Sequence, residues 1–205
     1  MARNTLSKKD IKELRQAARI PFGDKRTVLL LAGLTALVLL AIAGFSFLIT
    51  AGNDESFTPN ERGLLPVGSQ APDFTAETVN GASVSLGDAG GKEATMLVFF
   101  ASWCPHCNKE APLISQLENE YENLRVVMVG IDDRDDSEKV REFVDRYGIE
   151  GPATYEPSLR STYQASGYPT IYVIDGKQEI VAAHSGEAPK GVLEGWIGEA
   201  FRESG

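Results

Sequence analysis

A single uncharged stretch divides this chain and limits what it can fold into. Thr27–Thr50 contains 24 residues without Asp, Glu, Lys or Arg. A helix of that length spans roughly 36 Å, which is enough to cross the hydrocarbon core of a membrane with some tilt. A helix buried in a water-soluble core would normally keep a polar face, and this stretch has none. The sequence therefore predicts one transmembrane helix over residues 27–50, embedded in the lipid bilayer.

The charges on either side of this stretch predict its orientation. Residues 1–26 carry eight Lys and Arg against three Asp and Glu, whereas the remaining residues carry twelve against 26. Because positively charged flanks stay in the cytoplasm, we expect 1–26 to be a cytoplasmic basic N-terminus and 51–205 to be extracytoplasmic. A cleaved signal peptide is the alternative, since Ala41-Ile42-Ala43 matches a cleavage site. The acidic outer part argues against nucleic acid as a partner.

The outer part divides into a polar segment and a single domain. Residues 51–66 contain few large apolar side chains and predict a linker, and residues 67–205 have the length of one domain. Apolar runs, helical periodicity and the Asn80-Gly81 turn predict the elements of that domain. The predicted elements are strands at 73–78, 83–86, 96–101, 125–131, 170–175 and 178–184, a helix following residue 104, a helix following residue 135, and helices at 159–166 and 189–201. This order predicts an α/β fold, a three-layer α/β/α sandwich with a mixed central sheet.

Local signals predict further details of this domain. Asp135-x-x-Glu138 resembles a capping box at the start of a helix, and Gly148 is placed to end that helix. We interpret the acidic run Asp132–Asp136 as a solvated loop and helix start. His184 is expected to lie exposed at the end of a strand.

Both cysteines of the chain lie in one C-x-x-C motif, between a predicted buried strand and a predicted helix. At a helix N-terminus the unpaired N–H groups and the helix dipole stabilise a thiolate, so Cys104 is the candidate nucleophile. Pro105 suits the first helical position, because its missing N–H costs nothing there. Cys107, one turn into the helix, is the candidate resolving thiol. The pattern therefore predicts thiol–disulfide exchange.

Other functions of a cysteine pair fit this sequence less well. A structural disulfide over so short a loop would contribute only about 2 kcal/mol. Haem attachment needs a histidine directly after the second cysteine, and Asn108 stands there. A zinc site needs a second Cys or His pair at ligand spacing, which His106 and His184 do not form, so neither a metal nor another cofactor is predicted. A peroxidase does not need a resolving cysteine at this spacing. A copper metallochaperone that uses the two cysteines and a histidine stays open as an alternative.

At these residues the outer domain resembles the thioredoxin superfamily, and within it the membrane-anchored TlpA/ResA-like thiol–disulfide oxidoreductases. The resemblance is carried by VGSQAPDFTAETVNG, VFFASWCPHCNKEAPLI and GYPTIYVID, and it covers about residues 66–203. It implies a thioredoxin fold with an added N-terminal β-hairpin and a helical insertion before Pro169. It also implies that Tyr168-Pro169 is a cis peptide bond at the active site, where Pro169 leaves its neighbour's backbone free to pair with substrate.

The resemblance assigns further residues to the site. ResA-like proteins have a glutamate three residues after the second cysteine, and here that residue is Glu110. It would accept or deliver the proton of Cys107; the alternative is a solvent-facing glutamate beside Lys109. Trp103 and Tyr168 are expected to flank the thiols and to give substrate an apolar platform.

His106 leaves the direction of electron flow open. A positive charge between the cysteines would stabilise the Cys104 thiolate and make the disulfide more oxidising. Pro105-His106 is also the dipeptide of the strong oxidant DsbA. The family resemblance implies instead the reduction of disulfides in envelope proteins, with cytochrome c maturation as a candidate pathway. Electrons would come from a membrane donor of the CcdA/DsbD type, and a DsbA-like oxidase is the alternative.

Overall fold

The computed structural model describes residues 63–204 of the chain. The predicted basic N-terminus (1–26), the predicted transmembrane helix (27–50) and most of the predicted linker (51–66) lie outside the described residues. Among the helices of residues 63–204, none combines the length and the hydropathy that a membrane crossing requires.

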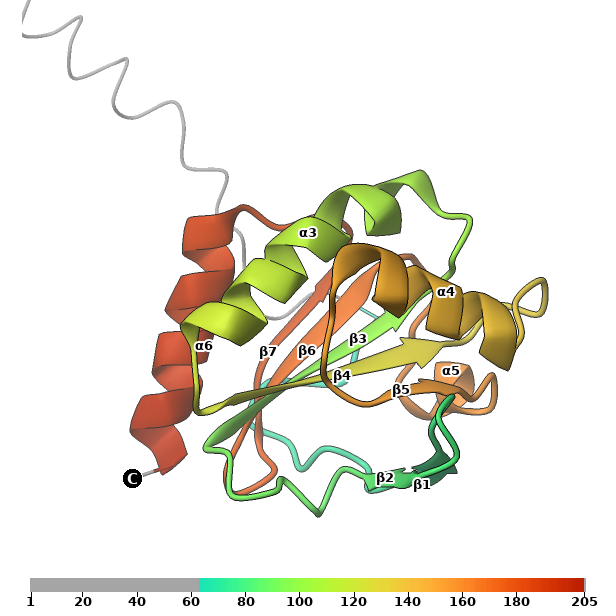
Figure 1. The fold of residues 1–205 in the computed structure, drawn as a ribbon. Helices are drawn as coiled ribbons and strands as arrows, with labels where there is room; N and C mark the ends of the chain where they lie inside the picture. Colours follow the sequence, from blue (N-terminus) through green and yellow to red (C-terminus); the bar gives the residue numbers. More distant parts are fainter. Residues whose placement is uncertain (1–62, 205) are drawn as a thin grey trace, which may run out of the picture. The chain divides into compact units, whose positions relative to one another are not determined.

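Seven strands and four helices make up the described part of the domain (Figure 1). The strands are β1 (Thr75–Glu77), β2 (Ser83–Ser85), β3 (Ala94–Phe100), β4 (Leu124–Gly130), β5 (Ala153–Tyr155), β6 (Thr170–Asp175) and β7 (Ile180–Ser185). The helices are α3 (Pro105–Glu120), α4 (Ser137–Tyr147), α5 (Leu159–Thr162) and α6 (Lys190–Ser204). Every strand and helix predicted for residues 67–205 has a counterpart here, while β5 was not predicted.

The central sheet is mixed, as the sequence predicted. Its strand order is β5-β4-β3-β6-β7, with β3, β4 and β5 parallel and with β6 antiparallel to both β3 and β7. All seven residues of β3 are buried, because this strand has neighbours on both edges and is covered on both faces. The C-terminal end of β3 leads directly into the segment that carries the two cysteines.

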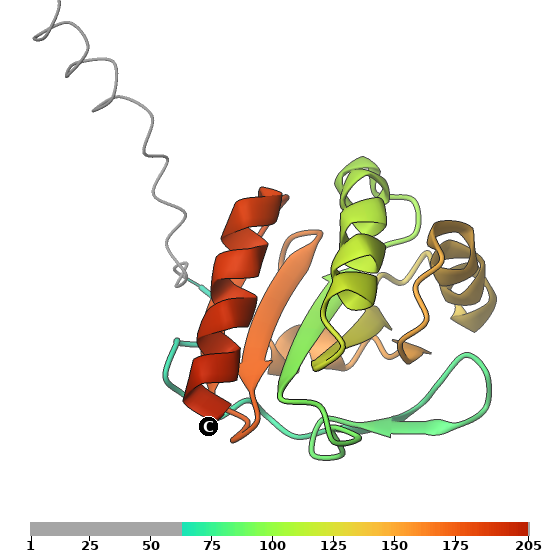
Figure 2. The same ribbon diagram turned by 60° about the vertical axis from the view of Figure 1, so that its left-hand side comes forward.

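Two separate cores cover the two faces of the sheet. Met96, Val98 and Phe100 of β3 pack with α3, α4 and α6, whereas Leu97 and Phe99 pack with the β1–β2 hairpin and α5. Figure 1 shows the three long helices on one side of the sheet, and Figure 2 shows α3 and α6 running along that same side. The three predicted layers are therefore unequal, because the second face carries one four-residue helix and an antiparallel hairpin.

The start of α4 corrects one prediction. Its N-cap is Asp136, whose side chain accepts a hydrogen bond from the Lys139 N–H at 2.9 Å, so the predicted capping role of Asp135 is wrong. The C-terminal end was predicted correctly: Gly148 adopts a left-handed conformation with φ of 64° and caps the last carbonyls of the helix.

Candidate active site

Cys104 and Cys107 lie at the junction between β3 and α3. Cys104 is the N-cap residue of α3, with extended backbone angles (φ −71°, ψ 123°), and Pro105 is the first helical residue, as predicted. The Asn108 N–H donates to the Cys104 carbonyl at 3.1 Å, so the helix begins at the motif itself. Both cysteines are free thiols in this structure.

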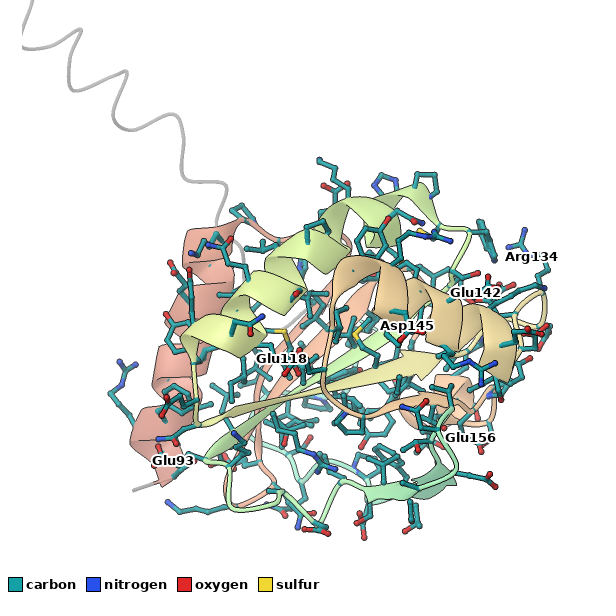
Figure 3. The ribbon with its side chains drawn as sticks, in the orientation of Figure 1. Glu93, Glu118, Arg134, Glu142, Asp145 and Glu156 are labelled. Atoms are coloured by element: carbon teal, nitrogen blue, oxygen red, sulfur yellow. The ribbon has the colours of Figure 1, made fainter. Side chains whose placement is uncertain are left out.

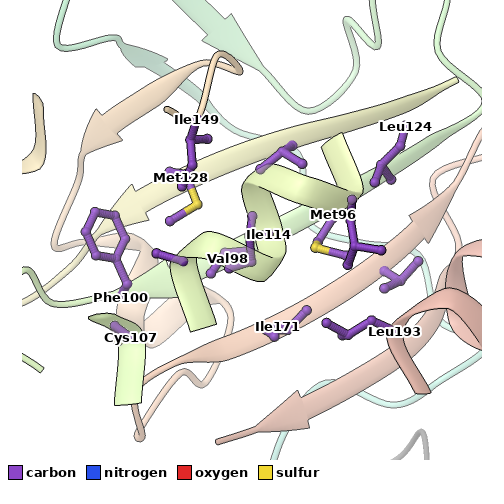
Figure 4. Close-up of a cluster of buried hydrophobic side chains, with 14 of the residues drawn as sticks. Met96, Val98, Phe100, Cys107, Ile114, Leu124, Met128, Ile149, Ile171 and Leu193 are labelled. Atoms are coloured by element: carbon purple, nitrogen blue, oxygen red, sulfur yellow. The ribbon is translucent and has the colours of Figure 1, made fainter. Parts of the chain in front are cut away.

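The two thiols differ in their surroundings. Cys104 is 5% exposed and its Sγ lies 3.6 Å from the carbonyl oxygen of Tyr168. Cys107 is 2% exposed and belongs to the apolar core under α3, where Figure 4 shows it with Phe100, Val98 and Ile171. Burial is the main cause that raises the pKa of the Cys107 thiol far above its ordinary value. Cys107 therefore keeps its proton at neutral pH unless a nearby group accepts it.

Glu110 is buried one turn further along α3, with 3% of its surface exposed. The solvent-facing alternative for this residue is wrong. Its two carboxylate oxygens accept the Ala188 N–H at 3.2 and 3.3 Å. Burial raises the pKa of Glu110 to about 7, against the opposing effects of the Ala188 hydrogen bond and of Lys109. Glu110 can therefore both take up and release a proton near neutral pH.

A cavity of about 370 Å³ lies beside Glu110, between α3 and the segment that connects β7 to α6. Its lining residues are Lys109, Glu110, Leu113, Glu187, Ala188 and Pro189.

The Tyr168-Pro169 peptide bond is cis, which confirms the prediction. It directly precedes β6, and the Tyr168 carbonyl oxygen faces the Cys104 Sγ atom. On its other side, the Pro169 carbonyl accepts the Gly186 N–H at 2.7 Å. The fold therefore brings residues 104 and 168, which are distant in the sequence, into one site.

Trp103 and Tyr168 lie beside Cys104 and contact each other edge to face, with ring centroids 6.2 Å apart. Trp103 is 43% exposed. Both side chains donate to one buried carboxylate, that of Asp132: the Trp103 Nε1–H at 3.1 Å and the Tyr168 hydroxyl at 3.2 Å. The prediction that Asp132–Asp136 is a solvated loop and helix start is therefore wrong at Asp132, which is buried.

Two arginines complete the surroundings of Asp132. Arg134 pairs with it at 2.9 Å, and its guanidinium carbon lies 3.4 Å from the centroid of the Trp103 ring. Figure 3 labels Arg134 in the segment between β4 and α4. Arg160 lies 3.6 Å from the same carboxylate and also donates to the Tyr168 hydroxyl. The hydrogen bond from Arg134 is the largest of the effects that hold the pKa of Asp132 well below its usual range, so this residue is a carboxylate at any neutral pH.

Asp135 is also buried, and it holds the loop that precedes the cysteines. Its carboxylate accepts the Ser102 N–H at 2.7 Å and the Ser102 hydroxyl at 2.5 Å. No local pattern indicates this contact, because 33 residues separate the two partners.

His106 is exposed on the first turn of α3, and its Nδ1 lies 2.7 Å from Glu187 Oε1. Glu187 comes from the segment after β7, pairs with Lys109 as well, and was not predicted as a site residue. The prediction for His184 is wrong: it is buried, its ring centroid is 5.7 Å from that of Trp196, and its Nε2 lies 3.2 Å from the Glu187 carbonyl oxygen. Within residues 63–204, no three His, Cys, Asp or Glu side chains are grouped so that they could hold a metal ion.

A mixed sheet, a cysteine pair at the N-terminus of a long helix and a cis-proline facing it define a dithiol protein of the thioredoxin-like α/β fold. The chain belongs to the AhpC/TSA family, whose model matches residues 67–183.

Individual proteins similar to this chain indicate its activity more closely than the family does. The chain is 34% identical to the thioredoxin-like protein YneN of Bacillus subtilis, over 80% of this chain and 94% of that protein. It is 28% identical to the thiol-disulfide oxidoreductase ResA of Bacillus anthracis, over 84% of this chain and 96% of that protein. It is also similar to the crystal structure of a thiol:disulfide interchange protein of the thioredoxin family from Chlorobium tepidum (TM-score 0.59, 25% identity, 65% of this chain and 97% of the other). These relatives confirm the resemblance to ResA-like thiol–disulfide oxidoreductases.

Proposed function

We propose that this chain is a membrane-anchored, extracytoplasmic oxidoreductase that reduces disulfides in proteins of the cell envelope. The observation that carries the proposal is the pairing of two unlike thiols: Cys104 at the helix N-terminus facing the cis-Pro169 loop, and buried Cys107 one turn below. The relatives named thiol–disulfide oxidoreductases support the activity. The uncharged stretch 27–50 and the basic residues before it support the anchor and the location.

The first step is attack by the Cys104 thiolate on a substrate disulfide. The substrate S–S bond breaks, a mixed disulfide forms at Cys104, and the released substrate thiolate takes up a proton. The helix N-terminus favours the attacking thiolate. Pro169 has no N–H of its own, and together with Trp103 and Tyr168 it would hold an extended substrate segment across Cys104.

The second step releases the reduced substrate. Cys107 loses its proton and attacks the Cys104 sulfur, so the mixed disulfide breaks, the Cys104–Cys107 bond forms and the second substrate thiol leaves. Because burial raises the pKa of Cys107, this step needs a proton acceptor. Glu110, with a pKa of about 7, fits that role. Two electrons pass to the substrate, and a membrane donor of the CcdA/DsbD type would return two electrons to the protein.

Trapping the intermediate tests the proposal. With Cys107→Ser, the mixed disulfide at Cys104 should accumulate, whereas Cys104→Ser should form none. A suitable substrate is a peptide with an intramolecular disulfide in a C-x-x-C-H sequence, because such a motif is where haem attaches to a c-type cytochrome. Accumulation of the mixed disulfide with a generic disulfide substrate but not with this peptide would contradict only the candidate role in cytochrome c maturation. No adduct with any disulfide would contradict the whole proposal.

A disulfide-donating oxidase is the second candidate, and His106 between the cysteines is the observation that favours it. The reduction potential of the full chain, equilibrated against glutathione or dithiothreitol buffers, separates the two. A value at or below roughly −230 mV supports the reductase, and a value near roughly −120 mV supports the oxidase.

A further inference from the structure

One short segment after β7 contacts three parts of the site. The Gly186 N–H donates to the carbonyl of Pro169 at 2.7 Å, and the Ala188 N–H donates to both oxygens of Glu110. Between them, the carboxylate of Glu187 reaches His106 on the first turn of α3, with 2.7 Å between Oε1 and Nδ1. The position of Glu187 is thus fixed on both sides by backbone hydrogen bonds to residues of the site.

Glu187 stands between two basic side chains of α3. It pairs with Lys109 as well as with His106, and Lys109 first and His106 second hold the pKa of Glu187 below its usual range. The buried carboxyl of Glu110 lies near these three side chains. Glu187 raises its pKa and Lys109 lowers it. His106 is largely open to solvent, whereas Glu187 is about three-quarters covered.

We propose that Glu187 is a positioning residue that pairs with His106 and so keeps the Cys104–Cys107 couple more reducing than its WCPHC sequence would otherwise make it. The inference rests on the proposed disulfide exchange and concerns its direction. It would explain how a histidine between the cysteines is compatible with a reductase.

The physical argument concerns the reduced state. Reducing the couple breaks the Cys104–Cys107 bond, takes up two electrons and yields a Cys107 thiol and a Cys104 thiolate or thiol. An imidazolium near Cys104 stabilises the thiolate and therefore favours the reduced form, which makes the disulfide a stronger oxidant. A carboxylate 2.7 Å from the same imidazole draws the ring toward itself and opposes its positive charge. Both effects remove stabilisation from the thiolate, so the couple becomes more reducing.

The test compares the full chain with its Glu187→Gln variant at pH 6. Equilibration with reduced and oxidised glutathione, followed by thiol trapping, gives the equilibrium constant of the couple. We expect Glu187→Gln to shift this constant about threefold to tenfold toward the reduced protein, which corresponds to about 15–30 mV for a two-electron couple. The alkylation rate of Cys104 should also remain high to lower pH than in the parent chain.

Three matched variants make the outcome decisive. Glu120→Gln removes a carboxylate at the far end of α3, where it pairs with Lys190, and should leave the equilibrium constant unchanged. In a His106→Ala background, Glu187→Gln should shift the constant less than it does in the parent chain. Glu187→Asp keeps the carboxylate and should shift the constant less than Glu187→Gln does. An unchanged constant, or an equal shift with and without His106, would overturn the inference. Failure to form any Cys104–Cys107 disulfide would instead contradict the proposed function.

Discussion

Burial, more than position in the sequence, determines the chemistry of the residues around the dithiol. Glu110 and Lys109 are neighbours on α3, yet Glu110 is buried and Lys109 is exposed. Cys104 and Cys107 are both buried, but Cys104 is the N-cap of α3 and faces the Tyr168 carbonyl, whereas Cys107 lies one turn into the helix, where burial raises the pKa of its thiol. All four residues lie at the start of α3. The groups that bury them or form hydrogen bonds with them belong instead to β3, to the Tyr168-Pro169 loop before β6 and to the segment after β7.

Glu110 also predicts how stability depends on pH. Its pKa is raised from an ordinary carboxyl value to about 7, so the folded state binds this proton more tightly than the unfolded state does. The contribution of Glu110 to stability is therefore fully present below about pH 4.5 and is lost as the pH rises through 7. Glu110→Gln should raise the free energy of unfolding relative to the parent chain by up to about 3 kcal/mol at pH 8, and by much less at pH 5.

Denaturant titrations of both proteins at the two pH values check this prediction. Glu118→Gln is the matched variant on the same helix. Burial also raises the pKa of Glu118, so this substitution should likewise raise the free energy of unfolding more at pH 8 than at pH 5, although Glu118 lies beside the 150–151 backbone, away from the cysteines. A difference between Glu110→Gln and the parent chain that is equal at pH 5 and pH 8 would contradict the assignment.

At the scale of elements, the acidic segment between β4 and α4 serves two purposes at once. Asp136 caps α4, whereas Asp135, one residue earlier, holds the loop that leads to the cysteines through Ser102. Asp136→Ala should lower the free energy of unfolding by about 1 kcal/mol, the usual contribution of an N-cap, and leave the reduction potential unchanged. Asp135→Ala should change the potential, because it releases the backbone next to Trp103. Chemical denaturation and redox titration of both variants check the contrast, and a shift of potential with Asp136→Ala would contradict it.

The same segment shows what the sequence could and could not predict. The strands and long helices follow from apolar runs and helical periodicity, and the helix end at Gly148 follows from glycine's access to positive φ. The cap was placed one residue too early, because adjacent aspartates satisfy the same pattern. The three-residue strand β5 was missed because it is too short for an alternating pattern, and within the central sheet it pairs with only the last three residues of β4.

At the scale of the site, local sequence patterns could not predict contacts between residues that are distant in the sequence. The cysteine pair, its helix start and the cis-Pro169 loop were found from the motif and its family resemblance. Asp132 and Glu187 were not found as site residues, because the Asp132–Trp103 and Glu187–His106 contacts span 29 and 81 residues and neither residue belongs to a motif. Their roles follow from the packing of the β4 and β7 ends around the start of α3.

At the scale of the whole molecule, the uneven charge distribution gives the last prediction, the orientation of the chain in the membrane. Residues 1–26 are basic and the remainder is acidic, on either side of the uncharged stretch 27–50. Because the chain has only two cysteines, Cys104→Ser combined with Cys107→Ser leaves a background free of thiols. In that background, Glu199→Cys on the exposed face of α6 and Ser7→Cys in the basic N-terminus report the two sides separately.

A membrane-impermeant maleimide applied to intact cells should label the Glu199→Cys protein at once, and the Ser7→Cys protein only after the cells are permeabilised. This pattern is expected because basic flanks are retained in the cytoplasm while the following acidic domain crosses the membrane. Membrane fractionation of the same samples tests the anchor: the labelled protein should sediment with the membranes and keep its full mass. Labelling of both positions only after permeabilisation would place the domain in the cytoplasm. Release of a shortened Glu199→Cys protein would show instead that the uncharged stretch is cleaved.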